Sequence, residues 1–165
     1  MLRAAESRGQ GRESGSVKPG SKHHVLTDAD GIPLTCSVTA ANRHDISEMA
    51  PLVNQLPEVA GKVGHPRRQP DALQGDLGYD SEPHRQGLRL MGIQPVLPEK
   101  VIDDDSGLGA NRWPVERTLS WLHQNRRQRI RSERRPDIHQ AFLTLGCIKI
   151  CASTTHLVLL GVLRN

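Results

Sequence analysis

Arg112, Glu116 and His123 share one narrow face if residues 112–123 form a helix. At about 100° per residue, Glu116 lies about 40° from Arg112, and His123 lies about 20° from Glu116. The neighbouring stripe of this helix is apolar and holds Val115, Leu119 and Leu122. A carboxylate flanked by cations could hold a divalent metal ion against a phosphodiester if a second carboxylate faced it. Taken alone, however, Glu116 is better explained as a surface carboxylate paired with a nearby arginine.

Asp76 is the candidate for the second carboxylate, because it follows a short run, residues 72–75, that predicts a strand. Open α/β sheets place their ligand sites at the carboxyl ends of strands. Gly75 and Gly78 would let a backbone or a phosphate approach closely. Asp76 alone fits a turn cap equally well or better, so the metal-site hypothesis depends on its combination with Glu116.

Positive charge is concentrated in one part of the chain. The formal net charge is +4 and the sequence pI is about 9.3. Residues 112–135 hold eight arginines and two glutamates, which gives this stretch +6 and the remainder −2. Such a local excess is typical of proteins that bind an acidic polymer, and the four Trp, Tyr and Phe residues are too few for base stacking on single strands. The side chains expected to contact duplex phosphates are Arg112, His123, Arg126, Arg127, Arg129 and Arg131. For His123, a plain surface histidine is an equally good interpretation.

The cysteines and the apolar segments indicate a cytoplasmic protein that has no contact with membranes. Cys36, Cys147 and Cys151 form no CxxC pair and are interpreted as small buried hydrophobes in a reducing compartment. The longest apolar run, residues 157–163, is too short to span a bilayer.

The pattern of elements predicts one α/β domain with a mixed sheet. Residues 1–20 are rich in Gly, Ser and charge and predict a mobile arm outside the core. The expected elements are a hairpin over 24–39, helices over 47–55 and 81–91, strands over 72–75 and 93–97, and helices beginning near 113 and 136. The face of the last helix expected to pack on the sheet holds Ile138, Ala141, Phe142, Leu145, Ile148 and Cys151.

Several motifs together resemble the catalytic domain of bacterial insertion-sequence DDE transposases, over roughly residues 1–152. They are residues 18–28, 41–45, 75–81, 112–118 and 131–139. The resemblance implies a ribonuclease-H-like mixed sheet with flanking helices. In that family two Asp and one Glu bind two Mg²⁺ (or Mn²⁺) ions, which serve first to nick the element end and then to transfer the strand. The resemblance assigns Asp76 as the second acid and Glu116 as the third.

The same resemblance assigns two cationic positions. Arg112 and Glu116 match the Arg and Glu of the family's Tyr-Arg-Glu-Lys signature, and His123 stands where its Lys usually stands. It also implies that the partner is double-stranded DNA, both as element ends and as target, and that the protein is located at the nucleoid. A homo-oligomer or a partner transposase reading frame is a further expected partner.

Two departures from the family pattern shape the expected activity. The first acid would fall upstream of Met1, so we expect the first strand to be missing and residues 21–152 to form a partial catalytic domain. Residues 153–165 follow no family pattern and are expected to form an atypical tail. Two carboxylates hold Mg²⁺ weakly, so we expect little or no transposition by this chain alone. The alternatives are a catalytically dead DNA-binding remnant that competes for element ends, and a different metal nuclease of similar fold.

Overall fold

A computed structural model describes residues 2–8, 20–58, 69–75, 79, 81–97 and 113–159; for residues 2–8, 113 and 157–159 it describes the backbone alone. Its centre is a five-stranded sheet with the order β3-β2-β1-β4-β5. The strands are β1 (Leu2–Arg8), β2 (Ser21–Thr27), β3 (Pro33–Ala40), β4 (Ala72–Gln74) and β5 (Gln94–Val96). Strands β1, β2 and β3 pair antiparallel, whereas β4 pairs parallel with both β1 and β5. The sheet is therefore mixed, as the sequence predicts.

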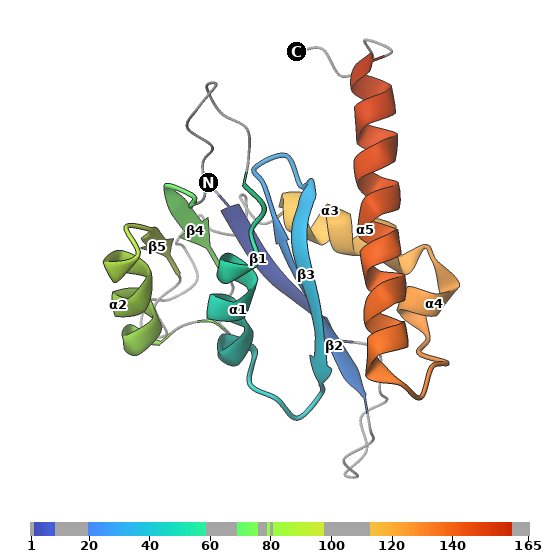
Figure 1. Cartoon of the computed structure of the whole chain (residues 1–165), viewed down its shortest axis with the longest axis horizontal. Coiled ribbons are helices and arrows are strands. Elements are labelled where there is room, and N and C mark those ends of the chain that lie inside the picture. Colours follow the sequence, from blue (N-terminus) through green and yellow to red (C-terminus); the bar gives the residue numbers. More distant parts are fainter. Residues whose placement is uncertain are drawn as a thin grey trace.

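Helices lie on both faces of this sheet (Figure 1). They are the 3₁₀ helix η1 (Asp45–Glu48) and the α-helices α1 (Met49–Asn54), α2 (Glu82–Leu90), α3 (Trp113–His123), α4 (Arg126–Arg129) and α5 (Pro136–Leu159). Figure 1 shows α5 as a long helix beside the β2–β3 hairpin, with α2 at the opposite end of the sheet next to β5. The predicted helices are confirmed to within a few residues of their expected bounds.

The predicted hairpin is confirmed as β2 and β3, with Val25 opposite Cys36. The Asp28 carboxylate closes its turn by accepting the backbone N–H groups of Asp30 and Ile32, at 2.9 and 2.8 Å. Gly31 has φ +77° and supplies the left-handed residue that the turn requires. The Asp28 carboxylate therefore has a structural role in this turn.

Strand β1 corrects two expectations about the start of the chain. Residues 1–20 were expected to form a mobile arm and the first strand was expected to be missing, but Leu2–Arg8 is the middle strand of the sheet. Its register pairs Ala5 with Val25 on one side and Leu2 with Leu73 on the other. The sequence of this strand lacks apolar alternation, so only its backbone pairing on both edges reveals it. Residues 9–19 lie outside the described part of the chain.

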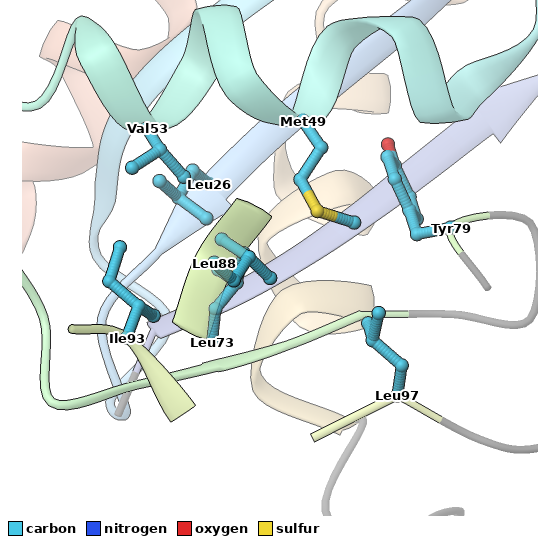
Figure 2. Packing of buried hydrophobic residues seen from close by; sticks show 8 residues of the cluster. All are labelled: Leu26, Met49, Val53, Leu73, Tyr79, Leu88, Ile93 and Leu97. Carbon is cyan, nitrogen blue, oxygen red and sulfur yellow. The ribbon is translucent and has the colours of Figure 1, made fainter. Parts of the chain in front are cut away.

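The sheet separates two hydrophobic cores. The first, called here the α1–α2 core, comprises Leu26, Met49, Val53, Leu73, Tyr79, Leu88, Ile93 and Leu97 (Figure 2). The second, the α3–α5 core, comprises Val25, Val115, Leu119, Leu122, Leu143, Cys147 and Ile150. Neighbouring residues of β2 enter different cores because side chains alternate across a strand, with Leu26 on one face and Val25 on the other.

Helix α5 packs on the sheet with a different face from the one expected. Leu143, Cys147 and Ile150 are buried, whereas Leu145 and Ile148 are 58 % and 56 % exposed. The predicted face holding Ile138, Ala141, Phe142, Leu145, Ile148 and Cys151 is therefore wrong in its main members. The helix has apolar residues on more than one side, so its spacing alone could not identify the buried side.

Helix α5 also continues past the boundary at which the atypical tail was expected to begin. It runs without interruption to Leu159, so residues 153–159 extend the helix, and residues 160–165 lie outside the described part. No helix within the described residues is both long enough and apolar enough to cross a bilayer.

Candidate active site

Two buried residues flank the position of Asp76 in the sequence. Gly75 directly follows β4, and its backbone N–H donates to the carbonyl of Val96 at 3.3 Å. A Cβ at Gly75 would lie 2.7 Å from Leu97 Cδ2 and 3.3 Å from Tyr79 Cβ, so a larger residue here would require the Leu97 side chain to move. Tyr79 is buried, and its hydroxyl lies 3.0 Å from His24 Nδ1. Asp76 itself lies outside the described residues, so its predicted role remains a prediction.

Glu116 lies in the first turn of α3 and its side chain is exposed. The apolar stripe predicted beside it is confirmed, since Val115, Leu119 and Leu122 are all buried in the α3–α5 core. A carboxylate in the first turn also interacts favourably with the positive end of the helix dipole. Arg112, the predicted cation of the same face, lies outside the described residues.

The hairpin turn holds the amino-terminal half of α3 in place. The Thr118 hydroxyl hydrogen-bonds both the Gly31 carbonyl and, at 3.0 Å, the Pro114 carbonyl. The Arg117 guanidinium donates to the Asp30 carbonyl and lies over the Trp121 ring, 4.7 Å from its centre. Sequence analysis missed these contacts, because residues 87 positions apart give no local signal. They fix the helix that carries Glu116 against the β2–β3 hairpin.

His123 faces the protein interior at the carboxyl end of α3. Its ring lies 6.1 Å from the ring of His23, centre to centre, and its side chain is half-buried. Burial lowers the pKa of His123, and the nearby Arg129 lowers it further. The ring is therefore neutral near pH 7 and offers phosphate no positive charge, unlike the Lys that the family signature usually has here.

A buried histidine pair lies next to His123. His23 Nε2 and His139 Nε2 are 2.8 Å apart, which joins β2 to the start of α5. Burial is the main cause that lowers the pKa of His23 to about 3, and the pKa of His139 is lowered by burial and by Arg131. Two neutral rings can share this hydrogen bond, one donating and the other accepting. His23 thus has a structural role in this region.

Exposed arginines cover α4 and the segment that follows it. Arg126, Arg127, Arg129 and Arg131 are all exposed, as the DNA-contact hypothesis requires. Two of them also make local contacts. Arg127 pairs with Glu133 and lies 4.6 Å from the centre of the Phe142 ring, and Arg131 donates to the Glu133 carbonyl at 2.9 Å. Helix α4 contacts both α3 and α5, so these arginines lie beside the helix that carries Glu116.

The strand that precedes Asp76 in the sequence and the helix that carries Glu116 both contact β1. Strand β4, which precedes Asp76, pairs with β1, and α3, which carries Glu116, packs on β1 and β2. Within the described residues, no group of three or more His, Cys, Asp or Glu side chains could hold a metal ion. Of the two proposed carboxylates these residues include only Glu116, so by themselves they do not form a metal site.

The family model of the transposase DDE domain matches residues 1–150 of this chain. The chain belongs to the family of insertion-sequence DDE transposases. The matched region contains all five strands, both proposed acidic positions and the arginine-rich segment. The family predicted from the sequence motifs is confirmed.

Two curated transposases are similar to this DDE transposase chain. It is 52 % identical over 138 residues to the transposase assigned to insertion sequence element IS402 of Burkholderia cepacia, covering 84 % of this chain and 65 % of that protein. It is 30 % identical over 134 residues to the transposase for insertion sequence element IS1106 of Neisseria meningitidis serogroup B, covering 81 % and 38 %. The chain therefore spans less than two thirds of the length of either relative.

A solved structure shares the fold of this DDE transposase chain. It is a chain in the cryo-EM structure of a simian T-cell lymphotropic virus intasome in complex with PP2A regulatory subunit B56 gamma, with a TM-score of 0.53. The match covers 86 % of this chain and 46 % of that chain, at 14 % sequence identity. At this identity the likeness concerns the fold alone, which supports the mixed α/β architecture.

Proposed function

We propose that this chain forms the catalytic-domain portion of an insertion-sequence transposase that acts on double-stranded DNA, with a ribonuclease-H-like sheet. The observation that carries the proposal is the family match over residues 1–150, which includes a five-stranded mixed sheet with α3 and β4 both beside β1. The fold likeness to a chain of a viral intasome is consistent with it.

In this proposal Asp76 and Glu116 bind divalent cations, Mg²⁺ or Mn²⁺. Such ions, two in an intact site of this family, activate an attacking oxygen and stabilise a leaving oxygen in phosphodiester chemistry. The exposed position of Glu116 on a helix fixed to the hairpin supports its role, because a ligand must be held still and remain accessible. Asp76 enters the proposal through its sequence position after β4 and the family resemblance alone.

The DNA-contact role falls mainly on the exposed arginines. Arg126, Arg127, Arg129 and Arg131 are available to a phosphate backbone, and Arg112 joins them on sequence grounds. His123 is the weakest member of the predicted set, since its neutral ring lies against His23.

A nicking assay on purified protein tests the metal site. Two carboxylates bind Mg²⁺ weakly, so we expect little or no nicking of terminal-repeat DNA by this chain alone. Mg²⁺-dependent nicking that disappears in both Asp76→Ala and Glu116→Gln would contradict the expected inactivity while supporting the two acids. Asp30→Asn, an exposed acid in the hairpin turn, is the matched control and should leave any nicking unchanged.

The second candidate function is DNA binding without catalysis, in competition with active transposases for element ends. The exposed arginines favour it, because they do not depend on either acid. Changing both Arg126 and Arg129 to Ala should reduce the slope of log affinity against log salt by about 2. Arg135→Ala is the control, because this exposed arginine is paired with Asp137.

Titration of labelled duplex DNA at several salt concentrations measures this slope and separates the two functions. Binding that is indifferent to Mg²⁺ and equal in Asp76→Asn and Glu116→Gln would favour the non-catalytic candidate. An unchanged slope in the double arginine variant would remove α4 from the DNA interface. The same samples in light scattering would reveal a homo-oligomer, and co-purification with a second transposase reading frame would reveal that partner.

A further inference from the structure

Arg127, one of the arginines proposed to contact DNA, is paired with a carboxylate that water hardly reaches. Its guanidinium donates to Glu133 Oε1 and lies 4.6 Å from the centre of the Phe142 ring on α5, which α4 flanks (Figure 1). The Arg127 side chain is 59 % exposed, whereas the Glu133 side chain is 7 % exposed. Carboxylate and phosphate groups bind a guanidinium through the same N–H groups. Glu133 and a DNA phosphate therefore compete for Arg127.

The second oxygen of this carboxylate faces a buried histidine without bonding to it. Glu133 Oε2 lies 3.6 Å from His139 Nδ1, which is longer than a hydrogen bond. Both atoms are buried, and neither has a hydrogen-bond partner among the described residues. The His139 side chain is 1 % exposed, and its Nε2 lies 2.8 Å from His23 Nε2. Glu133, His139 and His23 thus form a continuous buried row, called here the Glu133–histidine row, with Arg127 at its exposed end.

The cation at the exposed end keeps the two histidines of this row neutral. Burial raises the pKa of Glu133, but hydrogen bonds from its own backbone N–H and from Arg127 outweigh this effect, so the pKa is lowered. Burial and Arg131 lower the pKa of His139, and Glu133 opposes them. A buried carboxylate without a cation is strongly disfavoured. If Arg127 left Glu133, the carboxylate would therefore draw a proton to His139.

The other titratable and charged groups around the row are all bases. Those that face His139, His23 or the neighbouring His123 are Glu133 and Arg131 between α4 and α5, Arg127 and Arg129 of α4, His123 of α3 and His24 of β2. Each of them except Glu133 disfavours a positive charge on the histidines. A proton on His139 is thus stabilised through Glu133, and only when Glu133 is not already neutralised by Arg127.

We propose that His139 replaces Arg127 as the cation of Glu133 when Arg127 binds a DNA phosphate, so that DNA binding takes up one proton. Before binding, His23 Nε2–H donates to His139 Nε2, and His139 Nδ1–H faces Glu133. On binding, one proton from solution enters at His23 Nδ1, a buried atom without a hydrogen-bond partner among the described residues. The proton on His23 Nε2 passes to His139 Nε2, and His139 Nδ1–H closes onto Glu133 Oε2. The row gains one proton as it loses one guanidinium.

Titration of labelled duplex DNA at pH 6 and pH 8 tests this exchange, which rests on the proposed DNA-binding role of the arginines. We expect binding at pH 6 to be tighter by at least about fivefold, because proton uptake links affinity to pH. His139→Gln and Glu133→Gln should each remove most of this difference. His156→Gln changes an exposed histidine of the same helix and should keep it. Circular dichroism confirms that each variant is folded.

Arginine variants show which cation exchanges. Arg127→Ala should weaken binding more at pH 6 than at pH 8, because Glu133 holds Arg127 at the higher pH. Arg126→Ala, at a neighbouring exposed arginine, should weaken binding equally at both. At pH 8, Glu133→Gln should tighten binding by about threefold or more, but not in combination with Arg127→Ala. Equal losses at the two pH values for Arg127→Ala, or weaker binding by Glu133→Gln, would overturn the proposal.

NMR titration of the histidine rings without DNA separates this proposal from the proposed function. In Arg127→Ala the pKa of His139 should rise by at least about 1, because Glu133 has lost its other cation. Adding Glu133→Gln to that variant should abolish the rise. An unchanged pKa of His139 would overturn the exchange even if the chain binds DNA. The expected rise in a chain that binds no duplex DNA would instead overturn the proposed function, and the exchange with it.

Discussion

On the α1–α2 side of the sheet, His24 is buried and both of its ring nitrogens are hydrogen-bonded. Nδ1 lies 3.0 Å from Tyr79 Oη, and Nε2 lies 2.8 Å from Thr39 Oγ1. On the α3–α5 side, its neighbour His23 contacts another histidine, and His23 Nδ1 has no hydrogen-bond partner among the described residues. Hydroxyl groups can accept from a protonated imidazole, whereas a second imidazole can do so only while one of its own nitrogens is unprotonated. Burial lowers the pKa of both histidines, but Asp45 and Glu48 oppose this effect at His24, whereas His139, His123 and Arg131 lower the pKa of His23 further. The two faces therefore differ in how strongly they disfavour a charged histidine.

The largest expected effect is a loss of stability on truncating a fully buried leucine, which both cores contain. Leu73 in the α1–α2 core and Leu143 in the α3–α5 core are both fully buried, so Leu73→Ala and Leu143→Ala should each cost about 3 kcal/mol of unfolding free energy. Urea unfolding at pH 7.5 measures both. Leu145→Ala, on the exposed side of α5, should cost under about 1 kcal/mol. If Leu145→Ala lost more unfolding free energy than Leu143→Ala, the face of α5 predicted from the sequence would be the buried one.

The next largest expected effect is a loss of unfolding free energy in acid, which should come mainly from the α3–α5 side of the sheet. His23 has its pKa lowered to about 3, by burial first and then by His139, His123, His24 and Arg131. The unfolded chain takes up this proton near pH 6.5 and the folded chain does not, so stability is complete above pH 6.5 and falls toward pH 3. The loss is about 1.4 kcal/mol per pH unit, or roughly 2 kcal/mol at pH 5.

Urea unfolding between pH 7.5 and 5 measures that slope. His23→Gln removes the titrating group while keeping a polar side chain opposite His139, and should flatten the slope. His44→Gln changes an exposed histidine just before η1 and serves as the control. A slope that stays the same without His23 would mean that other groups on this face dominate the acid response.

The smallest difference concerns two glycines with positive φ, one near each core. Gly31→Ala should cost about 2 kcal/mol or more, because a Cβ there would lie 2.7 Å from the Pro114 carbonyl oxygen in a left-handed conformation. Gly92→Ala, after α2, meets nothing within 4 Å and should cost only about 1 kcal/mol for its φ of +75°. Thermal unfolding measures both variants. If their midpoints were equal, α3 would have to move away at Pro114 to make room for the added Cβ.

The parts of the fold that the sequence predicted are those specified by local signals. The β2–β3 hairpin follows from an Asp-Gly turn between alternating runs, and α2 follows from Ser81 before its first turn and Gly92 after its end. Strand β1 could not be predicted, because its partners β2 and β4 lie elsewhere in the chain. The short helix α4 was missed for lack of any apolar period.

The candidate site shows the same limit. The helix that carries Glu116 and its apolar stripe could be read from spacing, but the inward position of His123 could not, because it depends on His23 from a distant strand. Spacing along one element predicts which residues share a face, and only the fold shows what that face meets.

The attachment of α3 to the hairpin turn affects which sequence changes the family can tolerate during evolution. Thr118 and Arg117 anchor the helix to the backbone carbonyl groups of Gly31 and Asp30, so the contact does not depend on the side chains of the turn. The hairpin thus fixes the position of Glu116, the residue before Arg117. Relatives could lengthen or shorten the stretch ahead of Trp113 and still present that acid at the same place.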